Sequence, residues 1–91
     1  MSTYSVHYRP AVYKDAAKLQ KAELLRIKIS IEQKLTVSPQ TYGLPLRGEL
    51  SRYWKLRVGS YRVVYEILPD RVVILAIAHR KDVYSISPRR I

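Results

Sequence analysis

Hydrophobic and polar residues change their spacing along this chain, and each change predicts a different kind of element. Residues 4–8 alternate tyrosine and valine with serine and histidine, a period of two that predicts a strand. Apolar residues then follow at helical spacing from Pro10, which suits the first turn of a helix. A second helical pattern covers residues 21–35 and ends before Pro39, because proline cannot continue a helix. The apolar stripe of this second helix is formed by Leu24, Ile27, Ile31 and Leu35.

Short apolar runs dominate the second half of the chain. A loop containing glycine and proline covers residues 40–49, and three strands are predicted after it, at residues 51–58, 61–68 and 71–79. The gaps at Gly59 and at Pro69 are short enough for antiparallel hairpins. The third strand is almost entirely apolar, so we expect it to be central and covered on both faces.

The predicted order of elements is β-α-α-β-β-β, which defines an α+β fold. We expect residues 1–91 to form one domain, with an antiparallel sheet and two N-terminal helices packed on one of its faces. The other face of the sheet is then partly open.

Charge and composition limit what the protein can bind and where in the cell it is expected. The 17 lysines and arginines against 7 acidic residues give a net charge of +10, which favours nucleic acid, an anionic membrane or an acidic protein. The chain has no cysteine, which excludes disulfides, thiolate metal sites and a cysteine nucleophile, and which fits a reducing compartment. Because no apolar run could span a bilayer and no signal peptide begins the chain, we expect a cytoplasmic protein with no membrane association.

The most specific chemical pattern is a set of cations at strand spacing. Lys55 and Arg57 share one face of their strand, and Arg62 follows at the start of the next. Like charges on one face repel each other, and a polyanion relieves that repulsion, so the sequence predicts a surface that binds phosphate. Beyond the last strand, Arg80 and Tyr84 can lie over the same face. The two histidines are far apart in sequence without companion ligands, so neither a metal site nor a cofactor is expected.

Residues 53–66 and 74–84, with Leu46-Arg47-Gly48 before them, resemble the RelE branch of the RelE/ParE toxin superfamily. The expected pattern there contains a Leu-Arg-Val-Gly strand end, a Tyr-Arg-Val-Val-Tyr-Glu strand and a His-Arg-Lys-Asp-Val-Tyr ending, all present here. The element order matches over essentially the whole chain, and the C-terminal half carries the specific signal.

The resemblance implies the toxin of a type II toxin–antitoxin system. Such a toxin is a small, metal-independent endoribonuclease, an mRNA interferase that enters the ribosomal A site and cuts the mRNA there, which inhibits translation. It also implies a heteromeric complex with a cognate acidic antitoxin.

The catalytic positions of the family fall on Lys55, Arg57, Arg62, Arg80 and Tyr84. Further cations are expected to contact RNA, namely Arg47, Arg52, Lys81, Arg89 and Arg90. One departure is Tyr53, where some members carry a lysine, which weakens the charge of the site or alters its preference.

Metal-free RNA cleavage needs a base for the ribose 2′-OH, cations for the charged transition state and an acid for the leaving oxygen. Tyr84 is the candidate base, because neighbouring cations favour its phenolate. Arginine suits phosphate oxygens through bidentate contact but hardly gives up a proton, so Arg80 is expected to stabilise charge. Lys55 is a candidate acid, and His79 is the alternative on pKa grounds, although strand alternation puts it opposite Arg80.

Other interpretations stay open at this stage. Lys55 and Arg57 are also ordinary residues for a solvated sheet face, and Tyr84 could simply pack its ring at an edge. A ParE-like inhibitor of DNA gyrase would share the fold without the nuclease chemistry. A non-catalytic nucleic-acid-binding module is the third possibility.

Overall fold

The computed structural model describes residues 3–86 and Arg90, which form three α-helices, five strands and short π- and 3-10-helical turns. The helices are α1 (Pro10–Ala17), α2 (Lys21–Ser30) and α3 (Pro39–Tyr42). One π-helical turn, Ile31–Leu35, extends α2, so the predicted helix over 21–35 is confirmed. The strands are β1 (Ser5–Tyr8), β2 (Leu44–Pro45), β3 (Trp54–Val58), β4 (Tyr61–Ile67) and β5 (Arg71–His79). No helix in these ranges is both long and apolar enough to cross a membrane.

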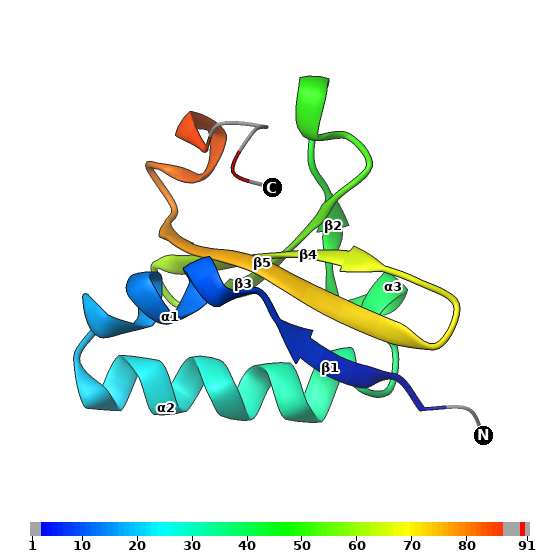
Figure 1. Ribbon diagram of the computed structural model, residues 1–91, viewed down its shortest axis with the longest axis horizontal. Helices are drawn as coiled ribbons and strands as arrows, with labels where there is room; N and C mark the ends of the chain where they lie inside the picture. Colours follow the sequence, from blue (N-terminus) through cyan, green and yellow to red (C-terminus); the bar gives the residue numbers. More distant parts are fainter. Residues whose placement is uncertain (1–2, 87–89, 91) are drawn as a thin grey trace.

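The five strands form one sheet in the order β1-β5-β4-β3-β2. Its helices lie on one side of the sheet, as predicted, and Figure 1 shows the segments around residues 46–50 and 80–86 rising on the other. The α+β fold is confirmed, and β2 to β5 pair antiparallel. The antiparallel prediction is wrong for β1, which pairs in parallel with β5 from Ser5↔Arg71 to Tyr8↔Ile74. No hairpin joins these two strands, and the intervening helices and strands let β1 run in the same direction as β5.

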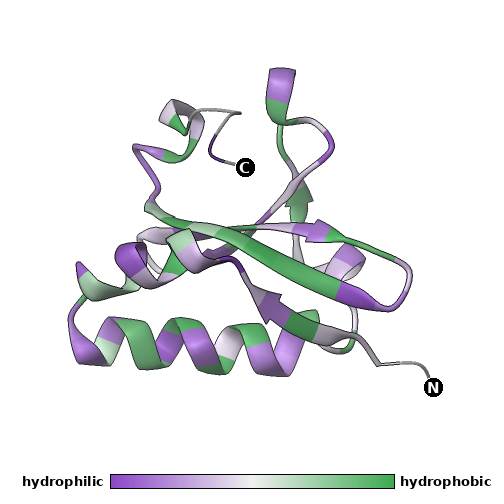
Figure 2. Cartoon of the chain, viewed as in Figure 1, coloured by the Kyte–Doolittle hydropathy of each residue, from purple (hydrophilic) through white to green (hydrophobic). Residues whose placement is uncertain are grey.

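Each face of the sheet covers its own apolar cluster. The larger cluster lies under the helices and joins Ile27, Ile31 and Leu35 to sheet residues that include Val63 and Tyr65. The smaller one lies on the opposite face and is formed by Leu46, Leu50, Val64, Leu75, Ala76 and Val83. Strand β5 contributes to both clusters and appears as a continuous apolar band in Figure 2, so the prediction of a central strand covered on both faces is confirmed.

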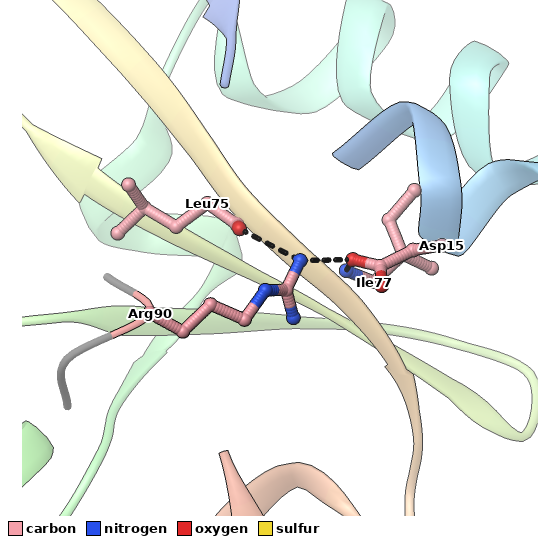
Figure 3. Close-up of polar contacts among 4 residues, drawn as sticks. All are labelled: Asp15, Leu75, Ile77 and Arg90. Atoms are coloured by element: carbon pink, nitrogen blue, oxygen red, sulfur yellow. Dashed lines mark hydrogen bonds and ion pairs between the residues drawn. The ribbon is translucent and has the colours of Figure 1, made fainter. Parts of the chain in front are cut away.

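A β-bulge in β5 breaks its alternation. The cross-strand pairs step from Val64↔Ala76 to Tyr65↔Ile74, which leaves Leu75 as the extra residue. Beyond the end of β1, the edge of β5 is covered by side chains (Figure 3). The Asp15 carboxylate accepts a 3.0 Å hydrogen bond from the Ile77 amide and pairs with Arg90, whose guanidinium also lies 3.4 Å from the Leu75 carbonyl. The Ile77 amide and the Leu75 carbonyl of the bulged strand therefore find hydrogen-bond partners in side chains of α1 and of the C-terminal segment.

The region between α2 and β3 holds more structure than the sequence indicated. The predicted loop over 40–49 contains the end of α3 and the two-residue strand β2, and the first regular residue of the next strand is Trp54. Gly43 is needed here because a Cβ atom would fall 1.7 Å from the Tyr65 hydroxyl. That hydroxyl is buried and donates a 2.7 Å hydrogen bond to the Pro39 carbonyl, which ties α3 to β4.

Tyr65→Phe is expected to destabilise the fold by about 1–3 kcal/mol, because the buried Pro39 carbonyl loses its donor. Chemical denaturation of the wild type and the variant measures this difference. Tyr53→Phe, which changes a half-buried tyrosine on the other face, is the matched control and should change stability by less. An unchanged midpoint for Tyr65→Phe would show that the hydrogen bond contributes nothing to stability.

Candidate RNA-cleaving face

The face of the sheet opposite the helices carries the predicted cations. In β3, Leu56 and Val58 point into the helix-side cluster, which places Lys55 and Arg57 on the opposite face. In β4, Val63 points to the helices and Arg62 to the same face as the two β3 cations. We call Lys55, Arg57, Arg62 and Arg80 the cation group.

Arg57 and Arg62 stand directly opposite each other on neighbouring strands. Like charges in such a pair destabilise a sheet. Arg62 is oriented by hydrogen bonds from its guanidinium to the carbonyls of Gly59 (3.1 Å) and Tyr61 (2.9 Å). Burial, followed by the charges of Arg57 and Arg80, lowers the pKa of Arg62 below its ordinary range. An anion bound between the three arginines would relieve the repulsion among them.

Arg80 joins the group through the end of β5. Its amide donates a 2.8 Å hydrogen bond to the Ser60 carbonyl, which extends the β4–β5 pairing past His79. His79 itself lies on the other face, where its ring and that of Tyr61 meet in a T-shaped arrangement with 5.7 Å between the ring centroids. The sequence-based placement of His79 opposite Arg80 is therefore confirmed, and His79 is not in position to act with the cation group.

Tyr84 is brought over this face by the short 3-10 turn Val83–Ser85. Val83 anchors the turn because its side chain is buried in the smaller apolar cluster, whereas Tyr84 remains 45% exposed. The Lys55 ammonium lies 5.4 Å and the Arg47 guanidinium 5.6 Å from the centre of the Tyr84 ring. A hydrogen bond from Arg47 lowers the pKa of the Tyr84 phenol, against a smaller opposing effect of burial, and the charge of Lys55 lowers it further.

Arg47 reaches Tyr84 from a separate loop. Leu46 and Leu50 on either side of it are buried in the smaller cluster, and the Leu46 amide donates a 2.9 Å hydrogen bond to the Tyr53 carbonyl. This anchoring holds Arg47 at the rim of the face. The sequence singled out Arg47 only as an RNA contact, and its contact with Tyr84 was missed because the two residues lie in loops far apart in sequence.

The other predicted RNA contacts are distributed more widely. Arg52 lies on the same face but is paired with Glu66 at 3.0 Å. Lys81 is exposed beside Arg80. Arg90 is bonded to Asp15 at the edge of β5, so the structure does not bring it to the cation group. Arg89 falls outside the described residues. In residues 3–86 and Arg90, no three histidine, aspartate or glutamate side chains converge as metal ligands would.

Comparison with known proteins shows the family to which this fold belongs. The family model described as the ParE toxin of type II toxin–antitoxin systems matches residues 6–84. Toxin RelG of Mycobacterium tuberculosis is 34% identical over 83 residues, which cover 89% of this chain and 95% of that toxin.

Solved structures agree with this match. The toxin–antitoxin complex RelBE2 of M. tuberculosis contains a chain with 33% identity and a TM-score of 0.82, over 90% of this chain and 97% of that one. A double mutant of the Escherichia coli toxin RelE in its free state shares the fold with a TM-score of 0.74 at 24% identity, over 98% of each chain.

The fold is thus that of the RelE-like toxins. The chain belongs to the RelE/ParE superfamily of type II toxin–antitoxin toxins.

Proposed function

We propose that this toxin is a ribosome-dependent endoribonuclease that cleaves mRNA in the A site. The observation that carries the proposal is the contact of Tyr84 with Lys55 and Arg47, next to the arginines of the cation group. The face offers a phenol with a lowered pKa beside cations that fit a phosphate, which are the components that metal-free RNA cleavage requires.

In the proposed reaction, the Tyr84 phenolate takes the proton of the ribose 2′-OH. The 2′-oxygen then forms a bond to the adjacent phosphorus while the bond from phosphorus to the 5′-oxygen breaks. Arg57, Arg62 and Arg80 stabilise the extra negative charge of the transition state. Lys55 gives a proton to the leaving 5′-oxygen, so the products are a 2′,3′-cyclic phosphate and a free 5′-OH.

Primer extension on a defined mRNA tests this function, with the protein added to programmed ribosomes or to naked RNA. Cuts inside the A-site codon that appear only when ribosomes are present are the expected result. Absence of cleavage in both samples, with folded protein, would overturn the proposal.

A gyrase inhibitor is the second candidate, because the matching family model is described as a ParE toxin. A supercoiling assay with purified DNA gyrase distinguishes the two. Inhibition of supercoiling without RNA cleavage would favour this second function.

We also infer an acidic antitoxin as the partner, since related RelE chains have been solved in toxin–antitoxin complexes. A mostly apolar groove of about 320 Å³ runs between α1 and α2, with Val12, Ala16 and Leu24 in its lining. Tyr13 borders it with 67% of its surface exposed, and Lys28 and Glu32 contribute one charge of each sign. This groove fits the apolar face of an amphipathic helix, and the net charge of +10 on the chain favours a partner with acidic residues around that face.

Tyr13→Ala is expected to weaken binding of the antitoxin encoded alongside by about tenfold, because an exposed aromatic contact is lost. Titration calorimetry of the purified pair measures the change. Tyr42→Ala, an exposed tyrosine of α3 outside the groove, is the control. If both variants bind the antitoxin with the affinity of the wild type, the antitoxin binds outside this groove.

A further inference from the structure

Glu66 is the one acidic residue in the strands that the structure describes, and it lies on the basic face. In β4, Val63 and Tyr65 point into the helix-side cluster. Arg62, Val64 and Glu66 therefore share the opposite face. A carboxylate on this face reduces its attraction for phosphate. Phosphate binding therefore does not explain why Glu66 is there.

Glu66 is held by a small group of neighbours. Its carboxylate lies 3.0 Å from the Arg52 guanidinium, with 24% of the Glu66 side chain and 70% of the Arg52 side chain exposed. Arg52 in turn lies 5.3 Å from the centre of the Tyr53 ring, which packs on the smaller apolar cluster. An exposed ion pair of this kind adds little to stability. The group instead offers an acceptor, a planar donor and an aromatic ring side by side.

The position of this group relative to the cation group fits one step along an RNA strand. Lys55 pairs across the sheet with Val64, and Glu66 lies two residues further along β4. Two strand residues span ~7 Å, comparable with the length of one extended nucleotide. When a phosphate is bound by the cation group, the neighbouring nucleotide can therefore reach Glu66, where the carboxylate repels a second phosphate and accepts hydrogen bonds from a base.

We propose that Glu66, together with Arg52, reads the base of the nucleotide beside the scissile phosphate and favours guanine. Guanine presents two adjacent N–H donors to the carboxylate and a carbonyl oxygen to the guanidinium, and no other RNA base has two such donors side by side on this edge. The Tyr53 ring, over which the Arg52 guanidinium lies, helps to hold that guanidinium beside Glu66. This specificity role rests on the proposed function, since the base is read during mRNA cleavage.

Fluorescence anisotropy with short oligouridine probes tests the proposal, each probe carrying one central guanosine, inosine or uridine. The wild type is expected to bind the guanosine probe about tenfold tighter than the other two, because inosine lacks the amino group and uridine lacks the second donor. Glu66→Gln should reduce this preference to less than about twofold, because the guanosine probe loses its contacts with the carboxylate while the inosine and uridine probes bind somewhat more tightly once the negative charge is removed. Asp70→Asn, which removes the same charge from an exposed turn, should keep the preference.

A wild type without guanosine preference, or a Glu66→Gln variant that retains it, would overturn the proposal. Mapping the cuts of both proteins on programmed ribosomes gives the second readout, in which Glu66→Gln should cut codons with and without guanosine more evenly. If ribosomes are not cut at all, the proposed function fails, whereas the binding preference still decides the role of Glu66.

Discussion

Replacing Tyr84 by phenylalanine will lower the single-turnover rate of mRNA cleavage on ribosomes by ~10²–10⁴-fold, the range expected when a general base is lost. The ring keeps its place, because the neighbouring Val83 anchors the turn and the contacts of Lys55 and Arg47 are made to the ring as well. The fall in cleavage rate therefore measures the contribution of the Tyr84 hydroxyl alone. Quenched-flow cleavage of A-site mRNA measures it, with toxin in excess over ribosomes.

The pH dependence of this rate separates a base from a structural tyrosine. If phenolate is the reacting form, the rate rises about tenfold per pH unit below the pKa of Tyr84 and levels off above it. The hydrogen bond from Arg47 lowers that pKa, so Arg47→Ala raises it and moves the rising limb to higher pH. Tyr84→Phe should abolish this limb. A Tyr84→Phe enzyme with the wild-type rate and pH profile would remove Tyr84 from the mechanism.

The sequence predicted the elements that have a clear period and missed those that depend on long-range contacts. The alternation in residues 55–58 and 61–65 was enough to place Lys55, Arg57 and Arg62 on one face. Strand β5 is nearly all apolar, so its sequence carries no alternation from which the bulge at Leu75 could be inferred. Because the bulge precedes Ala76, the alternation from there to Arg80 is intact, and the predicted opposition of His79 and Arg80 was unaffected.

Contacts between residues far apart in sequence decide where several of the predicted cations lie. Arg47 meets Tyr84 only because Leu46 and Val83 are buried in the same cluster, and neither loop has a period that predicts this. Asp15 and Arg90 are separated by 75 positions, and their pairing depends on β1 ending before β5 does. In each case tertiary packing, not local sequence preference, decides where a charged side chain lies.

Arg62→Ala is expected to lower the cleavage rate by ~10²–10³-fold, as when one preorganised donor to a transition-state charge is removed. The wild-type fold already aims the Arg62 guanidinium, through its hydrogen bonds to the carbonyls of Gly59 and Tyr61, so little reorganisation is needed when the phosphate charge develops. Arg62→Lys keeps the charge but loses the planar two-point contact, and an intermediate rate is expected.

Arg62→Ala should leave the free energy of unfolding unchanged or raise it. Arg62 stands opposite Arg57 in the sheet and close to Arg80, and its removal relieves this repulsion in the free protein. A fall in activity without a fall in stability is the behaviour of a residue kept for function at a cost to the fold. Thermal unfolding at low and high salt measures this, because screening should shrink the difference between Arg62→Ala and wild type. A variant that unfolds more readily and cuts at the wild-type rate would reverse the assignment and make Arg62 a structural residue of the β3–β4 turn.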